Sequence, residues 1–523
     1  MYHLFWLAVL AIGISTTSRA QGKAMRVTPN TRLTQLRQVI LDSQGRISLA
    51  KRGKRYPHWG SYQVEMKLPA GTTLRGIRLV NPQLPPRGSH TLFWPALTTD
   101  LITQVRVWQH AKWGAWLPRN LLAGGNFADT DGNGIPDFVS VMRLSPAGDA
   151  HFLDRDAGWE PPPGNWWQDK PRHDRGDFVV TNGSPVGMGN ALRLHREPGD
   201  SQDTAAMRKD LVPPNTTLTI SGWTRYNLGD QTSMGMMARF HEFNRAGERV
   251  NKYVLLGDDD FHQPSRASEW RWRAITFTTA RDTTYLNLYP IRMIAAGGQA
   301  WAAAYEVREG SVFSPWGKGK VVFREEFRDP QRWEFTDHTH SRLLPQGGLS
   351  LEPLPLTVSC AVQKDSLPVQ AGRLYSFRVN MENHVPSHYE PTHQSWCSVY
   401  LEFLDGQGRF LEYVKAMVFR PTLGRPLGAA MHAPPEARQA RFRLVASHIS
   451  YGDRGGMTGP MRVHFARLQL EESRYDPTFT PRPAADRITF DPPLSGHRIQ
   501  IRTLLLSRDP EVTPSFGGYE LLN

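Results

Sequence analysis

The sequence predicts an all-β protein, and three features of the chain point to that class. Its 523 residues include 45 glycines and 40 prolines, which favour frequent turns over long helices. Between these residues, short runs rich in Thr, Val, Trp, Tyr and Phe alternate apolar and polar positions, with the period of two that a half-buried strand requires. Two long segments also match each other, which indicates a duplicated β domain.

The N-terminus is expected to be a secretory signal. Residues 4–14 form an apolar run too short to cross a bilayer, and small residues suited to cleavage follow at Ser18 and Ala20. We therefore expect residues 1–20 to be removed and the mature protein to be secreted or periplasmic. The alternative is an uncleaved anchor, and no later stretch is apolar enough to span a membrane.

The two ends of the remaining chain are predicted to form one β-sandwich. Residues 26–118 alternate in short strand-like runs separated by proline and glycine. Residues 486–523 contain a similar run at 498–506 but are too few to form their own core. We expect them to complete the N-terminal sandwich, because a loop tolerates a long insertion at little entropic cost. The alternative is a strand added to the second repeat.

The middle of the chain contains a repeat. Residues 204–226 match residues 359–380, and further matches follow in the same order. The matching segments are about 155 to 161 residues apart, and a unit of that size is long enough to close its own core, unlike the short repeat of a solenoid. We therefore expect two tandem β-sandwich domains, residues 119–316 and residues 320–480.

Each repeat resembles the jelly-roll carbohydrate-binding modules of bacteria, the group that binds cellulose, xylan and β-glucan. The first copy opens with residues 120–127 and continues with the Ser-Gly-Trp strand at 218–226, and the second opens with residues 323–327. The resemblance implies two tandem jelly rolls that bind polysaccharide. The family usually has two aspartates after a late tryptophan, whereas alanines follow Trp301 here, so its structural calcium site is not implied.

The charge balance favours an anionic partner. Lys and Arg number 62 against 49 Asp and Glu, a net charge of +13. Outside the cell, such an excess attracts acidic polysaccharide or lipopolysaccharide in the envelope, rather than nucleic acid. The alternative is a dispersed and solvated set of charges without a specific partner.

One loop has the spacing of a calcium site. Alternate oxygen ligands with a glycine at the sixth position suit a hard cation such as Ca²⁺. The expected ligands are Asp129, Asp131, Asn133, the carbonyl of Ile135, and Asp137. Ser140 stands at the twelfth position, where a complete EF-hand loop has glutamate, so any such site is incomplete. The alternative is an ordinary turn, which Asp, Asn and Gly also favour.

Sugar binding requires flat apolar faces together with planar polar groups. A proline-rich loop at residues 159–169 supplies both, and Trp270 alternates with Trp272 on one side of a predicted strand, where one of the two is core. The predicted ligand contacts of the first module are Trp159, Trp166, Trp167, Gln168 and Trp270. The alternative is that Trp166 or Trp167 closes the edge of the sandwich. Trp223 is predicted to be core.

In the second module, residues 382–396 form a longer loop than the first module has. Its predicted sugar contacts are Tyr389 and Trp396. The alternatives are an ordinary polar loop and, because the loop holds three histidines, a transition-metal site, although their spacing fits no standard zinc pattern.

Both cysteines, Cys360 and Cys397, lie in predicted strands of the second module. An oxidising compartment would let them form one disulfide if those strands are neighbours. The alternative is two buried thiols.

No catalytic motif stands out in the sequence. Residues 258–260 are three adjacent aspartates in a turn, which favours solvent exposure, and neither a nucleophile elbow nor a zinc-protease helix nor a phosphate loop occurs. The sequence therefore favours a polysaccharide-binding protein without catalysis. The alternatives are a polysaccharide hydrolase or lyase, whose paired carboxylates a sequence cannot exclude, and an envelope scaffold or adhesion protein.

Overall fold

A computed structural model describes most of the chain between residues 25 and 522. The described residues are 25–27, 33–68, 72–85, 99–109, 111–114, 116–117, 120–130, 132, 134, 136–137, 139–144, 150–155, 178–187, 189–196, 202–207, 210–228, 236–257, 266–294, 298–314, 316, 318–336, 341–354, 357–384, 394–418, 426–449, 461–475, 477–479, 482, 487–495, 498–509 and 511–522.

The described part of the chain is all-β, which confirms the predicted fold class. Its strands assemble into large sandwich-like sheets, and the helical structure there consists of one short 3₁₀ turn, η1 (Pro330–Arg332). No helix in this part of the chain has the length and apolar character needed to cross a membrane.

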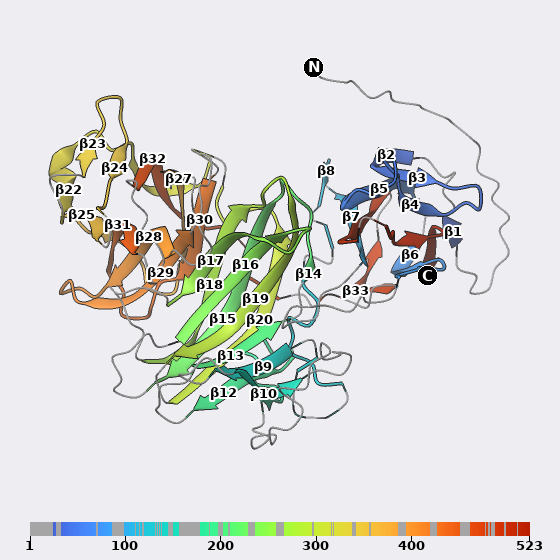
Figure 1. Cartoon of the computed structure of the whole chain (residues 1–523), viewed down its shortest axis with the longest axis horizontal. Coiled ribbons are helices and arrows are strands. Elements are labelled where there is room, and N and C mark those ends of the chain that lie inside the picture. Colours follow the sequence, from blue (N-terminus) through green and yellow to red (C-terminus); the bar gives the residue numbers. More distant parts are fainter. Residues whose placement is uncertain are drawn as a thin grey trace.

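Strands from both ends of the chain form one β-sandwich, which we call the interrupted sandwich. Its N-terminal strands are β1 (Met25–Val27), β2 (Leu33–Arg37), β3 (Val39–Leu41), β4 (Ile47–Leu49), β5 (Trp59–Lys67), β6 (Thr73–Leu79), β7 (Thr99–Gln109) and β8 (Lys112–Trp113). Its C-terminal strands are β33 (Arg487–Ser495), β34 (Arg498–Ser507), β35 (Ser515–Phe516) and β36 (Tyr519–Leu522). The blue and red strands of Figure 1 therefore lie together.

Two of the C-terminal strands, β34 and β36, take central positions in the interrupted sandwich. Strand β34 pairs with β5 on one side and with β7 on the other, and β36 lies between β1 and β6. Ile499 and Ile501 of β34 point into a core shared with Val64 and Val105. Because side chains alternate along a strand, Arg498, Gln500 and Arg502 lie on the opposite face.

The intervening chain forms two modules. The first module comprises β9 (Val139–Leu144), β10 (Ala150–Arg155), β11 (Val179–Val180), β12 (Ala191–Arg196), β13 (Gln202–Met207), β14 (Asp210–Leu211), β15 (Thr217–Asn227), β16 (Met236–Asn244), β17 (Arg249–Leu256), β18 (Arg266–Thr278), β19 (Thr283–Ile294) and β20 (Gly298–Glu309). The second comprises β21 (Lys320–Glu325), β22 (Trp333–Phe335), β23 (Arg342–Leu343), β24 (Leu349–Leu351), β25 (Val358–Gln363), β26 (Leu367–Pro368), β27 (Leu374–His384), β28 (Gln394–Leu404), β29 (Phe410–Val418), β30 (Pro426–His432), β31 (Gln439–Ile449) and β32 (Arg462–Glu472).

The two modules have the same central strand order. In one layer, β19, β16 and β17 of the first module correspond to β31, β28 and β29 of the second. In the other layer, β12, β20, β15 and β18 correspond to β24, β32, β27 and β30. A strand and its counterpart therefore occupy equivalent places in the two sandwiches, which permits a position-by-position comparison of their faces.

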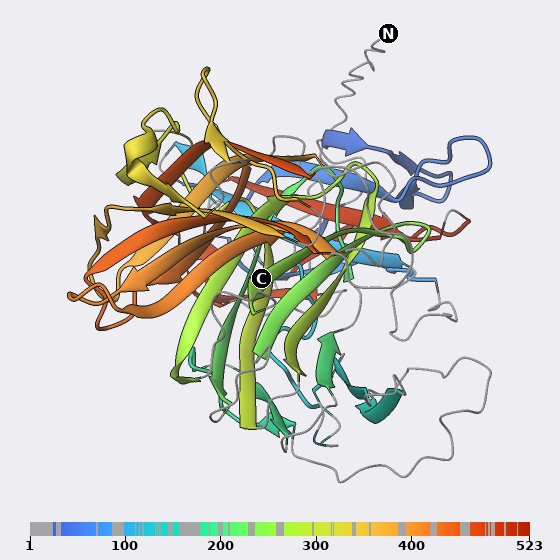
Figure 2. The same cartoon turned by 60° about the vertical axis from the view of Figure 1, so that its left-hand side comes forward.

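Both layers continue from one module into the other. The edge strand β17 pairs antiparallel with β29, its counterpart, and β18 pairs antiparallel with β30. The green and orange strands consequently lie side by side in Figure 2. Each pairing covers strand edges that would otherwise expose unpaired backbone groups. One continuous hydrophobic core runs through both modules and includes Ile220 and Phe442.

The interrupted sandwich packs against the first module. Leu504 and Leu506 of β34 belong to the core of the two modules. Arg482, which follows the second module, forms a buried ion pair with Asp100 at 2.8 Å and donates a hydrogen bond to the Leu121 carbonyl. These contacts fix the boundary between the interrupted sandwich and the first module.

The expected disulfide between Cys360 and Cys397 is wrong. Both side chains are buried, and no disulfide joins them. Strand β31 separates their strands: Cys360 lies opposite Val445, and Cys397 lies opposite Ala446. Two strand spacings amount to about 10 Å, beyond the reach of a disulfide, and adjacent residues of β31 point to opposite faces, so the two thiols do as well.

Candidate functional site

The tryptophan loop predicted to bind sugar lies outside the described residues, and so does Tyr389 of the second module. The loop residues concerned are Trp159, Trp166, Trp167 and Gln168. Their ligand-binding role stays a prediction.

Trp396 is not placed to bind a ligand. Its side chain is only 5% exposed and belongs to the continuous core of the modules, on strand β28. A sugar stacks on a ring that faces solvent, so the predicted contact at Trp396 is wrong. Alternation along β28 places this ring on the same face as Ser398 and Tyr400, which are also buried; Phe403, on the opposite face, contacts Tyr375 of the other layer.

The predicted calcium loop is described in part. Asp131, Asn133 and Ile135 lie outside the described residues. The Gly134 amide donates to Asp129 Oδ2 at 3.0 Å, and the Thr130 amide donates to Asp137 Oδ1 at 3.2 Å. These hydrogen bonds form a turn, which was the alternative to a calcium site. Within the described ranges, no cluster of three or more His, Cys, Asp or Glu could hold a metal ion. Calcium binding stays a prediction.

Trp270 and Trp272 lie on strand β18, as the alternation predicted. Trp272 is buried beside Tyr475 at a ring distance of 5.8 Å, whereas Trp270 is half-buried. Trp272 is therefore the core member of the pair. Trp223, opposite Trp272 on β15, is half-buried and packs against the same outer cluster. Ligand contact by Trp270 stays a prediction.

The outer face of the first module carries an indole between two arginines. Ala300 and Ala302 of β20 point into the core, so Trp301 between them points outward. Trp301 lies directly opposite Arg193 of β12 on one side and Arg225 of β15 on the other. The Arg225 guanidinium lies 4.8 Å from the Trp301 ring centroid, a cation–π distance. All three side chains are half-buried.

The next row on this face is polar. Gln299 lies opposite His195 on β12 and Asn227 on β15. His195 and Asn227 are exposed, and Gln299 is half-buried. We call the two rows together the tryptophan face; its members are Arg193, Trp301, Arg225, His195, Gln299 and Asn227.

The tryptophan face combines the two kinds of group that recognise sugars. Neighbouring strands lie about 4.8 Å apart, so the row of Trp301 forms a flat surface three strands wide. The indole offers apolar area, and planar amide and imidazole groups beside it can exchange hydrogen bonds with hydroxyls. Neither row contains a carboxylate, and the two arginines make the face basic.

The corresponding face of the second module has different side chains. His464 of β32 lies opposite Ser350 of β24 and Glu382 of β27, in the place that Trp301 occupies in the first module. Here Ser350 is buried, His464 is half-buried and Glu382 is exposed. The row therefore contains no large aromatic side chain and one acidic group.

The sequence pointed to Trp301 only as part of a motif and did not show its place in a cross-strand row. The signal was the alternation at Gln299, Trp301 and Ala303, with core alanines between them. Strand pairing was the missing information, because Arg193 and Arg225 reach Trp301 from distant parts of the sequence.

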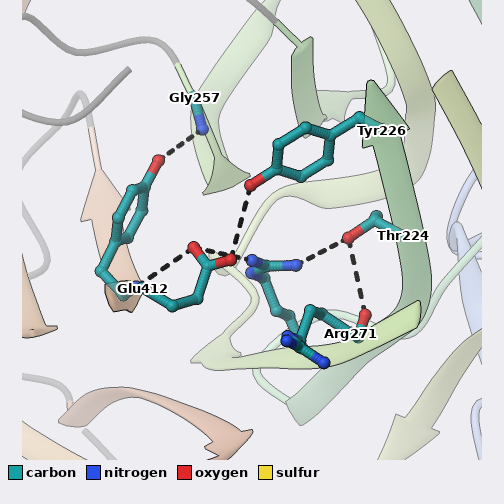
Figure 3. Close-up of polar contacts among 7 residues, drawn as sticks. Thr224, Tyr226, Gly257, Arg271 and Glu412 are labelled. Atoms are coloured by element: carbon teal, nitrogen blue, oxygen red, sulfur yellow. Dashed lines mark hydrogen bonds and ion pairs between the residues drawn. The ribbon is translucent and has the colours of Figure 1, made fainter. Parts of the chain in front are cut away.

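A buried charge cluster joins the two modules (Figure 3). Arg273 of the first module has no exposed surface, and its Nη2 lies 3.1 Å from Glu412 Oε1 of the second. Arg273 Nη1 donates to Thr224 Oγ1 at 2.7 Å, and the Tyr226 hydroxyl donates to Glu412 Oε2 at 3.5 Å. Burial raises the pKa of Tyr226. Since these groups lie between the layers and bond to one another, the cluster stabilises the junction and offers no surface to a substrate.

Comparison with known proteins identifies no family for this chain. No family model and no curated protein matches the sequence. Solved structures give weak similarities. A tandem CBM22 domain pair of Paenibacillus barcinonensis Xyn10C has 10% identity and a TM-score of 0.22, covering 54% of this chain and 90% of that one.

Two further structures are similar at the same low level. The fucolectin of striped bass, Morone saxatilis, has 11% identity and a TM-score of 0.12, covering 50% of this chain and 86% of that one. The ANX1 ectodomain of Arabidopsis thaliana has 9% identity and a TM-score of 0.15, covering 66% of this chain and 100% of that one. Such values establish neither a family nor a function.

Proposed function

We propose that this protein binds polysaccharide through the tryptophan face and does not cleave it. The observation that supports this proposal is the cross-strand row of Arg193, Trp301 and Arg225 on an outward sheet surface. A flat indole flanked by planar donors suits a sugar ring, because the apolar side of the ring stacks while its equatorial hydroxyls accept hydrogen bonds.

Binding without cleavage is favoured by the chemistry of the face. Glycoside hydrolysis requires two carboxylates on opposite sides of the scissile bond. The tryptophan face has none, and the buried Glu412 is held by Arg273 between the layers. The charged groups on the face are cationic, which suits positioning of a ligand and favours an acidic polysaccharide.

Several finer features belong to the same proposal. We infer that residues 1–20 direct export and that the mature protein acts outside the cytoplasm, where polysaccharides are accessible. The two modules are inferred to be duplicated jelly rolls, and the loop from Asp129 to Asp137 is inferred to bind Ca²⁺ weakly. The tryptophan loop of residues 159–169 is inferred to extend the binding surface.

The test is affinity electrophoresis of the mature protein in gels containing neutral or acidic polysaccharides. We expect retardation by at least one polymer, and we expect Trp301→Ala to weaken that affinity about tenfold, which corresponds to ~1.4 kcal/mol. The matched control is His464→Ala, which truncates the ring at the equivalent position of the second module and should leave retardation unchanged.

Two results would contradict the proposal. One is an absence of retardation by every polymer. The other is release of reducing ends or unsaturated uronates by the wild-type protein, because either product requires bond cleavage. Equal affinities of wild type and Trp301→Ala would show that the polysaccharide does not bind at the tryptophan face.

A further inference from the structure

The interrupted sandwich carries a second basic face with stacked tryptophans. Gln500 of β34 lies opposite Glu65 of β5 and Arg106 of β7. Arg502, two residues further along, lies opposite Gln63 and Gln104 in the same way. Gln500 and Gln104 are buried, and arginine and tryptophan side chains surround them. We call this surface the arginine face; its members are Arg106, Arg498, Gln500, Arg502, Trp113 and Trp116.

Two indoles lie over the guanidinium groups of this face. Arg106 is 5.2 Å from the ring centroid of Trp113 and 4.5 Å from that of Trp116. Arg502 is 4.4 Å from the Trp116 ring, and Arg498 is 5.4 Å from the Trp113 ring. Both tryptophans and Arg106 are half-buried, so the stack is partly open to solvent.

Arg106 differs from Arg498 and Arg502 in the charge of its hydrogen-bond partner. Arg498 pairs with Glu65, and Arg502 pairs with Glu309 at 2.7 Å. Within the described ranges Arg106 makes no ion pair: its Nε donates to the neutral Gln500 Oε1 at 2.7 Å. Burial, and next the positive charge of Arg502, lower the pKa of Arg106, while the carboxylate of Glu65 opposes that shift in part. A cation in this position gains from an incoming anion.

The groups around Arg106 favour a carboxylate as the incoming anion. Hydrogen bonding of Nε to Gln500 fixes the plane of the guanidinium, and the two indoles limit its rotation. A planar carboxylate matches a fixed guanidinium through two parallel hydrogen bonds. Glu309 lies at the end of β20, so the arginine face adjoins the first module, and ligand sites occur preferentially at such domain boundaries.

We propose that the arginine face is a second polysaccharide-binding site, selective for a hexuronate unit whose carboxylate pairs with Arg106 and whose ring stacks against Trp116. The site uses none of the residues of the tryptophan face. It extends the proposed function to the interrupted sandwich, and either site can fail without the other.

The test uses the full mature chain carrying Trp301→Ala, so that the tryptophan face contributes little. Polygalacturonate is the probe, and its methyl ester, which lacks the negative charge, is the control polymer. In affinity electrophoresis we expect retardation by polygalacturonate only. Arg106→Gln and Trp116→Ala should each weaken it about tenfold. Arg106→Lys should lose most of the affinity although the charge remains, because an ammonium group cannot form two parallel bonds.

The control variant is Arg373→Gln, which removes one exposed arginine of the second module and changes the net charge equally. It should bind as its parent does. Thermal unfolding verifies that each variant is folded, and Arg106→Lys keeps the test available if Arg106→Gln destabilises the sandwich. Three results would overturn the proposal: no retardation of the parent, equal retardation by dextran sulfate and polygalacturonate, or equal losses in Arg106→Gln and Arg373→Gln.

Discussion

The two modules present corresponding faces with the same strand pairing and different chemistry. The middle row holds an indole between two guanidinium groups in the first module and an imidazole between a hydroxyl and a carboxylate in the second: Arg193, Trp301 and Arg225 against Ser350, His464 and Glu382.

The difference between the two faces shows that the fold constrains the inward side chains of a sandwich more than the outward ones. Inward residues of the paired strands, such as Ala302 in the first module and Phe465 in the second, are buried in one continuous core. Outward residues at the next position contribute little to that core, so they can change without altering strand register. Binding chemistry can therefore differ between two modules that share one backbone arrangement.

The largest expected effect concerns the buried Arg273–Glu412 pair, which joins the two modules. Glu412→Ala leaves the fully buried Arg273 without its carboxylate, and loss of one partner of a buried ion pair costs about 3–5 kcal/mol. Because the pair spans both modules, we expect one cooperative transition to shift in chemical denaturation. The control is Glu352→Ala, whose partners Arg342 and Arg462 are both exposed; it should cost at most about 1 kcal/mol. Separate transitions, with only the second module destabilised, would contradict a shared junction.

A second prediction exchanges the side chains that distinguish the two faces. Trp301→His combined with Arg225→Glu gives the first module two of the side chains found on the second. We expect loss of stacking and reversal of charge to weaken polysaccharide affinity by roughly thirtyfold, or ~2 kcal/mol. Titration calorimetry measures the affinity, and thermal unfolding should be little changed because both positions face outward. An unchanged affinity would show that the two faces do not differ in the way proposed.

The smallest expected effect concerns the cysteines, which only the second module contains. Since β31 separates Cys360 from Cys397, a thiol reductant should shift the melting temperature by less than about 1 °C. A clear decrease in the melting temperature would indicate a disulfide and contradict the strand order.

The buried Cys360 thiol also makes the stability of the folded protein depend on pH. Burial raises its pKa from the ordinary 9.0 to about 11. The folded state therefore favours the protonated thiol; this contribution to stability is fully present below pH 9 and is lost as pH rises from 9 to about 11. Cys360→Ser should flatten that part of a stability profile measured by denaturant unfolding. Rapid alkylation of Cys360 at pH 8 would contradict its burial.

Part of the site could be predicted from sequence because it depends on local alternation. The period of two at Trp270 and Trp272 placed both rings on one side of a strand. Local pattern could not show that Trp396 is buried, because an aromatic residue beside a loop suits a core or a surface equally. The faces themselves needed strand pairing. Arg502 meets Trp116 only because the chain returns to the interrupted sandwich after two modules, whereas Arg106 reaches Trp116 through the local pairing of Val105 with Leu117.

The sequence by itself determined the fold class, since turn residues and alternation act over a few positions. It also revealed the matched segments in the middle of the chain. Tertiary structure alone decided which outward residues share a row, that the layers of the two modules join edge to edge, and that the two thiols point apart. The physical reason is that a sheet brings together residues far apart in the chain, and hydrogen-bond register between strands is not written in either strand separately.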